Sequence, residues 1–300
     1  MTATNTMPRV AARIDSAYFN HHIAPEPQPE ATMQLSDDYL QTFSERGFVL
    51  VENFYPEEKR AAIAAAVRRT LPPWQEIKDD PPESPLLIDD FPYADQFFNK
   101  LIIDWDLIDF VQRILATEHI HFRYAHNWAR YPDPNREQPG LHRDNGNNSL
   151  LPANADHRYG QISTWYFPEA VPADQAPMRI IPRAHDQDLD KRELLTVPAG
   201  AIMIFNTHIW HSATLFTGRE GQRYSVTRIY GRADHYWEGV RSYTNLGMDE
   251  DFRVFIGTLS ARDRELFRFP PAGHEYYTSE TLGFLEEQYP GWNAKGEYTP

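Results

Sequence analysis

Three segments in the first third of the chain place apolar residues at the three- and four-residue spacing of amphipathic helices. The first begins at Ser36, the second follows Pro56 and runs to Arg69, and the third begins at Asp104. Serine and aspartate are favoured N-caps, because their side-chain oxygens accept hydrogen bonds from the free N–H groups of the first turn. The apolar run Gly47–Val51 follows the first helix and predicts the first strand.

From Ile120 onward the pattern changes to short apolar strands separated by turn residues. Strands are expected at Ile120–Arg130, Gln161–Phe167, Met178–Ile181 and Ala201–Ala213. The last is interpreted as one buried strand that follows the turn Val197–Gly200. Short strands behind a helical layer predict a mainly β fold with flanking helices, namely a double-stranded β-helix, or jelly roll, backed by helices.

The chain divides into three predicted parts. Residues 1–34 carry scattered prolines and charges without a sustained period, which indicates an N-terminal arm or a disordered leader. Residues 35–232 hold the first helices and the jelly-roll core. Residues 233–300 contain short helical segments broken by prolines, and we expect a C-terminal helical extension packed on the core. The proline-rich, acidic segment 71–85 is either a lid or a plain surface loop.

His142 and Asp144 are separated by one residue, so on an extended strand their side chains share a face and Arg143 points away. A second imidazole from a distant strand would complete a set of two histidines and one carboxylate, which is typical of non-haem Fe(II) oxygenases. His211, which follows Trp210, is the strongest candidate for that third ligand. The pattern therefore predicts an iron site.

Other histidines compete for the third position. His208 lies three residues before His211, so on one regular strand the two would face opposite sides. His185 lies at a corner after a proline-stopped strand and is expected to be structural. The helical His-Glu-x-x-His zinc pattern is absent, and a chain without cysteine has no thiolate ligands. Taken alone, His-x-Asp is a weak signal, because the segment Asp144–Asn148 is also rich in turn residues.

Arg223 and Ser225 are again two residues apart and share a predicted strand face. A guanidinium group beside a hydroxyl is well suited to binding a carboxylate, because the planar fork donates two parallel hydrogen bonds. Arg223 follows His211 by twelve residues. The alternative is that Arg223 is a solvated charge at the end of the polar run Arg219–Arg223.

In this order the pieces resemble the phytanoyl-CoA dioxygenase family of Fe(II)/2-oxoglutarate oxygenases, from about Leu35 to about Arg232. The similarity extends to the basic and proline-containing stretch Arg130–Pro134 and to Trp165 in its strand. The chain departs from the family pattern at turns around the core, where Ala176, Arg183, Ala184 and Ala199–Gly200 replace the usual residues. These departures indicate a divergent subfamily.

The resemblance implies that His142, Asp144 and His211 are the metal-binding and catalytic residues, with Fe(II) as the metal. It also implies that Arg223 and Ser225 bind 2-oxoglutarate as co-substrate, and that dioxygen is the other reactant, with succinate and carbon dioxide as products. In the halogenase branch of this superfamily alanine or glycine replaces the carboxylate ligand. Because Asp144 is present, hydroxylation is favoured over halogenation.

A small-molecule substrate is expected, although the sequence does not name it. Four residues close to the ligands are candidates for the substrate wall, namely Trp165, Asn145, Asn147 and Asn206. The alternatives are a non-catalytic jelly-roll ligand-binding protein and a cupin-like metalloenzyme that does not use 2-oxoglutarate. The complete ligand set argues against the first, and the carboxylate-binding pair argues against the second.

Composition narrows the possible partners. The 29 Lys and Arg against 43 Asp and Glu give a formal charge of −14, which repels nucleic acid and anionic membranes and favours a neutral or cationic substrate. The absence of cysteine fits a reducing compartment. No basic-then-apolar leader and no long apolar run is present, so a cytoplasmic location is expected. The oligomeric state stays open.

Overall fold

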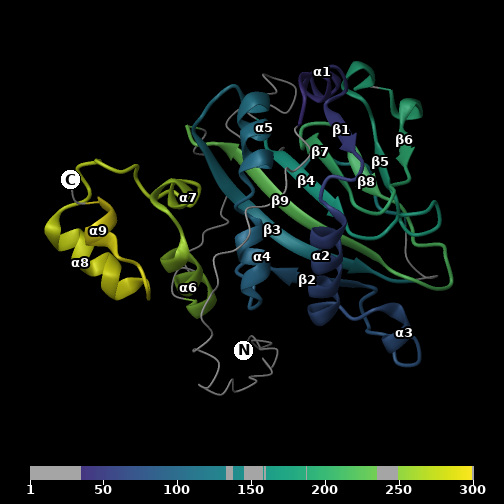
Figure 1. Ribbon diagram of the computed structural model, residues 1–300. Coiled ribbons are helices and arrows are strands. Elements are labelled where there is room, and N and C mark those ends of the chain that lie inside the picture. Colours follow the sequence, from purple (N-terminus) through teal and green to yellow (C-terminus); the bar gives the residue numbers. More distant parts are fainter. Residues whose placement is uncertain are drawn as a thin grey trace, which may run out of the picture. The chain divides into compact units, whose positions relative to one another are not determined.

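In the computed structural model of this protein, the described residues are 35–132, 138–144, 158, 160–186, 188–234 and 249–298. Their main sheet is antiparallel and has six strands (Figure 1). In spatial order these strands are β1 (Phe48–Val51), β7 (Ala201–Asn206), β4 (Ile162–Phe167), β9 (Arg223–Arg232), β3 (Ile120–Arg130) and β2 (Leu86–Asp90). The long strands β3 and β9 are neighbours, and both contribute side chains to a cavity wall.

A second antiparallel sheet has three strands, in the order β6 (Glu193–Leu195), β5 (Met178–Ile180) and β8 (His211–Ala213). One apolar cluster joins the two sheets, because Met178 and Ile180 of the small sheet pack with Trp165, Met203 and Phe205 of the large sheet. The 3-10 turns η4 (Arg183–His185) and η5 (Leu189–Lys191) lie between β5 and β6. Two sheets around a shared apolar layer are the architecture predicted for a jelly roll.

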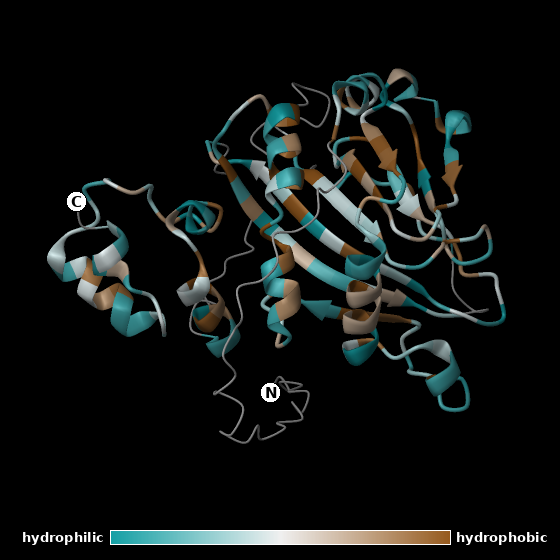
Figure 2. Cartoon of the chain, viewed as in Figure 1, coloured by the Kyte–Doolittle hydropathy of each residue, from teal (hydrophilic) through white to brown (hydrophobic). Residues whose placement is uncertain are grey.

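Helices cover the other face of the main sheet. They are α1 (Asp37–Arg46), α2 (Glu57–Thr70), α4 (Gln96–Leu101) and α5 (Trp105–Leu115), and the short α3 (Trp74–Ile77) follows α2. Side chains alternate between two layers along β9. Tyr224, Val226 and Tyr230 belong to the helix-side core, and Arg228 donates to the carbonyl of Leu101 at the end of α4, whereas Thr227 and Ile229 line the cavity between the two sheets. Figure 2 shows apolar and polar residues in alternating bands along β3 and β9.

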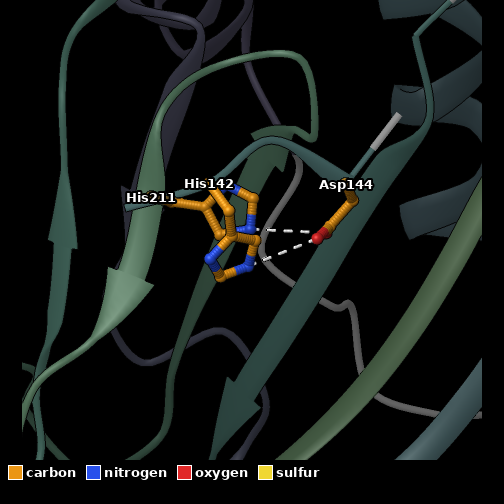
Figure 3. Close-up of side chains that lie close together, drawn as sticks. All are labelled: His142, Asp144 and His211. Atoms are coloured by element: carbon orange, nitrogen blue, oxygen red, sulfur yellow. Dashed lines mark ion pairs between the residues drawn. The ribbon is translucent and has the colours of Figure 1, made fainter. Parts of the chain in front are cut away.

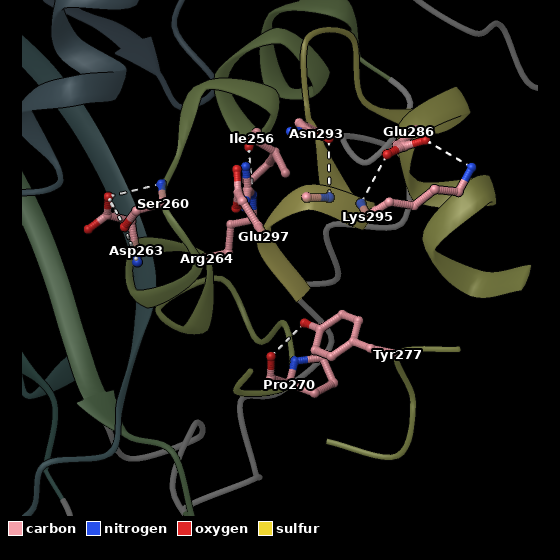
Figure 4. Close-up of polar contacts among 11 residues, drawn as sticks. Ile256, Ser260, Asp263, Arg264, Pro270, Tyr277, Glu286, Asn293, Lys295 and Glu297 are labelled. Atoms are coloured by element: carbon pink, nitrogen blue, oxygen red, sulfur yellow. Dashed lines mark hydrogen bonds and ion pairs between the residues drawn. The ribbon is translucent and has the colours of Figure 1, made fainter. Parts of the chain in front are cut away.

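The C-terminal part consists of α6 (Glu250–Thr258), α7 (Ala261–Glu265), α8 (Ser279–Gln288) and α9 (Ala294–Tyr298). The N–H of Phe122 in β3 donates to the carbonyl of Leu266 at 2.8 Å, which ties the end of α7 to the main sheet. Arg264, which is fully buried, donates to Glu297 and to the carbonyl of Ile256 (Figure 4). In the described part of the chain, no helix has the length and apolar character that a membrane span requires.

Most of the predicted elements are present. The helices predicted from Ser36, Pro56 and Asp104 correspond to α1, α2 and α5, and the side chain of Asp104 accepts from the N–H of Leu107 at 3.3 Å. At Ser36, by contrast, no side-chain capping bond forms. Strand β2 and helix α4 were not predicted. The sequence of β2 is short and partly exposed, and two of its five residues are acidic, as is common in an edge strand.

The prediction of a single strand over Ala201–Ala213 is wrong. β7 ends at Asn206, a turn follows, and β8 begins at His211 in the other sheet. The turn closes because the Asn206 side chain accepts from the N–H of His208 at 2.8 Å and the Asn206 carbonyl accepts from Ile209 at 3.1 Å. This change of sheet carries His211 away from the main sheet.

Candidate metal centre and its cavity

His142, Asp144 and His211 lie together, with one ligand atom from each within 4.8 Å of the others. Nε2 of His142 is 3.4 Å from Oδ1 of Asp144, and Nε2 of His211 is 3.3 Å from Oδ2 (Figure 3). Within the described residues this is the only group of three or more His, Asp and Glu side chains arranged to hold a metal ion. The three residues predicted as ligands are thus brought to one point.

The backbone holds this group in place. His142 and His211 exchange two hydrogen bonds of 3.0 Å, which form an isolated antiparallel bridge, and the N–H of Asp144 donates to the carbonyl of Thr207 at 3.2 Å. These hydrogen bonds hold the segment around His142 against β8 and against the turn that precedes β8. The prediction that this segment is a regular strand is wrong, because it forms only an isolated bridge. Arg143 points away, as expected, and forms an ion pair with Asp186.

Backbone carbonyls orient both imidazoles. Nδ1 of His142 lies 3.1 Å from the carbonyl of Gly140, and Nδ1 of His211 lies 2.9 Å from the carbonyl of Ile209. If Nδ1 carries the proton and donates to the carbonyl, the Nε2 lone pair of each ring is directed at Asp144. Metal-binding histidines are commonly fixed in this way by their second nitrogen.

The electrostatics of the group favour a charged carboxylate. Burial by itself disfavours the carboxylate, but the contacts with His142 and His211 outweigh it and hold the pKa of Asp144 well below its usual range. The same contact with Asp144 is the main reason that the pKa of His142 is raised. His211 is only 4% exposed, whereas the side chains of His142 and Asp144 are 53% and 40% exposed. The group is therefore buried on one side and open on the other.

The competing histidines lie elsewhere. His208 is buried in the turn after β7, and His185 is exposed in η4. Neither belongs to the ligand group. The prediction assigned His208 to the opposite face of one continuous strand, but the actual separation comes from the turn between the two sheets.

A cavity of about 420 Å³ opens beside the three residues, between the two sheets. On β3 the wall consists of every second residue from Tyr124 to Arg130, together with Arg123. Residues of β4, β9 and the small sheet complete it. Besides the three candidate ligands, the lining residues include Ile88, Arg123, Tyr124, His126, Trp128, Arg130, Gln161, Ser163, Trp165, Met178, Thr227 and Ile229. A volume of this size admits a small molecule.

Arg223 and Ser225 share a face of β9, as predicted, and both are almost completely buried. They lie opposite the lining residues Arg130 and Trp128, and the Arg223 guanidinium is 5.6 Å from the Trp165 ring centre. Nη1 of Arg223 donates to the carbonyl of Ala176 at 2.5 Å. Among the described residues, Nε and Nη2 of Arg223 and the hydroxyl of Ser225 have no hydrogen-bond partner.

Unpaired buried donors are costly, so these atoms indicate a ligand that accepts hydrogen bonds. Ala176, one of the departures from the family pattern, has a positive φ of 53°, and its carbonyl is the acceptor that holds Arg223. Burial, followed by the nearby charge of Arg130, lowers the pKa of Arg223 well below its usual value. A bound carboxylate would relieve both effects.

The candidates for the substrate wall have different positions. Trp165 lines the cavity. Asn206 is not among the lining residues, and its side chain holds the turn through the N–H of His208. Asn145 and Asn147 lie outside the described residues. No residue of the segment 71–85, considered as a lid, lines the cavity.

Several lining residues were not singled out from the sequence. Tyr124 and Arg130 alternate with His126 and Trp128 along β3, and the same alternation leads from Arg223 and Ser225 to Thr227 on β9. The signal was therefore present in the two-residue period of each strand. Arg123 breaks that period, because the register between β3 and β9 shifts between Phe122 and Tyr124.

No protein-family model and no curated protein sequence matches this chain. Solved structures do match. The non-heme α-ketoglutarate (2-oxoglutarate)-dependent epimerase SnoN from nogalamycin biosynthesis is 13% identical, with 68% of this chain and 85% of SnoN covered and a TM-score of 0.53. The carbocyclase SnoK, described as dependent on the same co-substrate and from the same biosynthesis, is 16% identical, with 73% and 93% covered and a TM-score of 0.52.

HygX from Streptomyces hygroscopicus, crystallised with nickel, 2-oxoglutarate and hygromycin B, is 16% identical, with 66% of this chain and 88% of HygX covered and a TM-score of 0.52. SnoN and SnoK are thus described as non-haem enzymes that depend on 2-oxoglutarate, and HygX was crystallised with 2-oxoglutarate bound. The described residues therefore share the jelly-roll fold of these solved structures, with mostly antiparallel sheets and flanking helices.

Proposed function

We propose that this protein is an Fe(II)- and 2-oxoglutarate-dependent dioxygenase that oxidises a small molecule. One observation carries the proposal: two imidazoles and one carboxylate converge on a point beside a cavity, and a buried arginine with unpaired donors lies near that cavity. The fold shared with SnoN, SnoK and HygX supports it.

The residues present fit the proposed metal. Two neutral imidazoles and a carboxylate are the ligand set that suits non-haem Fe(II) with positions left open. The low pKa of Asp144 keeps its carboxylate charged, and the carbonyls of Gly140 and Ile209 direct both Nε2 atoms inward. His142, Asp144 and His211 would therefore hold the iron.

The residues also fit the proposed co-substrate. Arg223 and Ser225 would bind the carboxylate of 2-oxoglutarate that lies farther from the metal, because their unpaired N–H and O–H groups need acceptors. The carbonyl of Ala176 keeps the guanidinium in position through Nη1. When bound, iron and 2-oxoglutarate together supply the oxidising power to break a C–H bond with dioxygen, and succinate and carbon dioxide are released.

The protein's own contribution is orientation and shielding. Trp128 and Trp165 meet edge to face with ring centres 5.2 Å apart, and Trp165 and His211 both pack against Phe205. This apolar surround limits the access of water to the buried side of the ligand group. The open side, at His142 and Asp144, is where the substrate would approach.

Hydroxylation is the proposed outcome. Asp144 occupies the position that is alanine or glycine in the halogenase branch of the superfamily that the sequence resembles. The structural neighbours include an epimerase and a carbocyclase, so the shared fold is compatible with other oxidations.

The proposed kinship with the phytanoyl-CoA dioxygenase family depends on the sequence motifs. HygX was crystallised with hygromycin B, and SnoN with nogalamycin RO, which supports a small-molecule substrate here.

The test is an anaerobic titration of the Fe(II)-loaded protein with 2-oxoglutarate, in which the visible charge-transfer band of the chelate is recorded. We expect the band in wild type and in His185→Ala, whose histidine is exposed and outside the ligand group, and no band in His211→Ala. A wild-type protein that binds iron but shows no band would overturn the proposal. It would leave a jelly-roll binding protein or a different metalloenzyme as the better interpretation.

A further inference from the structure

The segment 138–144 carries two of the three candidate metal ligands, and few backbone contacts hold it. Among the described residues, its backbone–backbone hydrogen bonds are the pair between His142 and His211 and the bond from Asp144 to Thr207. The side chains of His142 and Asp144 are 53% and 40% exposed, so packing around them is incomplete. Side-chain contacts of the neighbouring residues therefore decide how firmly the two ligands are held.

Arg143 stands between these two ligands, and its side chain lies on the other side of the segment. Its guanidinium forms an ion pair with Asp186, the residue that ends η4. The central carbon of the guanidinium also lies 4.7 Å from the ring centre of Trp210, a distance at which a cation is attracted to an aromatic face. The Arg143 side chain is only 18% exposed. A carboxylate and an indole thus hold one guanidinium at the same time.

Both partners of Arg143 belong to the small sheet and its adjoining turns. Trp210 directly precedes His211, the third candidate ligand, and its carbonyl accepts from the N–H of Ile181 at 2.9 Å, immediately after β5. The N–H of Asp186 donates to the carbonyl of Arg183 at 3.2 Å within η4. We call Arg143, Asp186 and Trp210 the arginine clamp. The clamp links the segment that carries two ligands to the segment that carries the third.

The clamp controls the direction in which the ligands face. Arg143 contacts Trp210 and Asp186 on one side of its segment, whereas His142 and Asp144 meet His211 on the other side (Figure 3). A rotation of the segment that moved the two ligands away from His211 would have to pull Arg143 out of the clamp. Contacts that orient metal ligands in this way commonly contribute to metal affinity.

Other side chains hold the beginning of the segment. Nη2 of Arg179 on β5 donates to the carbonyl of Pro139 at 2.5 Å and to the hydroxyl of Ser212 at 2.8 Å. The side chain of Gln138 donates to the carbonyl of Ala213 at 3.2 Å. These bonds fix the path of the chain before the ligands. The clamp, by contrast, acts through the residue that is bonded to both ligands in the sequence.

We infer that Arg143 is a positioning residue of the metal centre, which fixes His142 and Asp144 in their orientation and so raises the affinity for the metal ion. Arg143 does not line the cavity, so the role is exerted through the two ligands. The inference rests on the proposed function only in so far as His142, Asp144 and His211 hold a metal. It does not depend on the co-substrate or on the reaction.

Two measurements test this role without turnover, namely the Kd for Ni²⁺ from calorimetric titration and the visible spectrum of the Co²⁺-loaded protein. Arg143→Ala should raise the Kd for Ni²⁺ about tenfold and change the Co²⁺ spectrum, because the ligands lose their fixed orientation. Arg143→Lys should restore part of the affinity, since lysine keeps the charge for Asp186 but has no planar group to stack on Trp210.

Asp186→Asn tests whether the clamp acts as a unit. This variant alone should also weaken Ni²⁺ binding, because it removes the charge that holds the guanidinium. Arg143→Ala combined with Asp186→Asn should weaken binding by less than the product of the two separate effects, as expected for residues in contact. Effects that simply multiply would overturn the clamp.

The chain offers a matched control in Arg262 on α7. Its guanidinium lies 3.4 Å from the ring centre of Trp105 and pairs with Asp109 at 3.6 Å, so it repeats the combination of arginine, indole and carboxylate. The Arg262 side chain is 63% exposed, and Arg262 does not line the cavity beside the ligands. Arg262→Ala should therefore leave the Kd for Ni²⁺ and the Co²⁺ spectrum unchanged.

An unchanged Kd in Arg143→Ala, or equal losses of affinity in Arg143→Ala and Arg262→Ala, would overturn the inference. If Arg143→Ala does not fold, unchanged Kd values in both Arg143→Lys and Asp186→Asn would overturn it instead. A protein whose metal affinity depends on Arg143, but which shows no charge-transfer band with 2-oxoglutarate, would retain the positioning role and lose the proposed oxygenase function. A band in wild type with unchanged metal affinity in Arg143→Ala would do the reverse.

Discussion

Arg130 of β3 and Arg223 of β9 are direct cross-strand partners, and both are buried, with exposures of 9% and 1%. Two guanidinium groups side by side repel each other, and this repulsion adds to the effect of burial on the pKa of Arg223. A dianion bound next to the pair would reduce that cost. The pair therefore favours a dicarboxylate over a monocarboxylate at this end of the cavity.

The affinity for 2-oxoglutarate should depend on the two arginines to different degrees. Arg223→Gln removes the direct partner of a carboxylate and should raise Kd about 10- to 100-fold. Arg130→Gln removes a neighbouring charge and should raise Kd about three- to tenfold. The charge-transfer titration measures both, with Arg262→Gln as the control. A larger effect for Arg130→Gln than for Arg223→Gln would show that the anchoring residue has been misassigned.

Gly47 couples the end of α1 to the turn before His211. Its φ is +78°, and a Cβ there would lie 2.8 Å from Cγ2 of Ile209, whose carbonyl contacts Nδ1 of His211. Gly47→Ala should therefore lower the free energy of unfolding by about 2–3 kcal/mol and weaken metal binding. Gly273 has a similar φ of +86° with no atom within 4 Å, so Gly273→Ala should cost about 1 kcal/mol.

Urea unfolding of the two glycine variants measures their free energies of unfolding, and titration with Ni²⁺ measures their affinities for a metal ion. Equal losses of stability in both would mean that the contact with Ile209 relaxes without cost. Unchanged metal affinity in Gly47→Ala would show that the turn does not control His211.

Arg264 stabilises the C-terminal helices (Figure 4). Its Nη1 is 2.5 Å from Oε2 of Glu297, and its guanidinium lies 3.8 Å from the ring centre of Trp292. Arg264→Ala should lower the free energy of unfolding by about 2–4 kcal/mol, because it removes a buried cation whose partners remain. Arg262→Ala should cost about 1 kcal/mol or less, since the Arg262 side chain is 63% exposed. Thermal or urea unfolding measures the difference, and similar losses would contradict the assigned role.

His121 makes stability depend on pH. Burial and the neighbouring cations lower its pKa to about 4 in the folded protein, against 6.5 as the ordinary value. Between these values the unfolded chain binds a proton that the folded chain does not, so stability falls as the pH is lowered from about 6.5 to 4. After allowance for solvent screening, the contribution is about 1–2 kcal/mol.

His121→Gln should remove this contribution. The difference in unfolding free energy between wild type and His121→Gln, measured from pH 7 to pH 4, isolates it from the carboxylates that both proteins share. A difference that stays constant over this range would show that His121 titrates normally in the folded state.

Periodicity in the sequence was enough to predict α1, α2 and α5 and the strands β1, β3, β4 and β5. Their signals are local, because a helix or strand that buries one face repeats its apolar residues at a fixed spacing. The edge strand β2 was not predicted, since its partly exposed residues lack such a pattern. The break after Asn206 was not predicted either, because the apolar run Ala201–Phe205 continues into buried turn residues without a proline or glycine.

By itself, the sequence determined the order and types of the candidate site residues: His142 and Asp144 close together, then His211, then Arg223 with Ser225. Only the tertiary structure decided how they meet. The turn at 207–210 moves His211 into the second sheet, and the pairing of β3 with β9 places Arg130 opposite Arg223. The register shift at Phe122 brings Arg123 into the cavity wall. Pairing between distant strands sets these positions, and a local residue pattern carries no information about which strands pair or in which register.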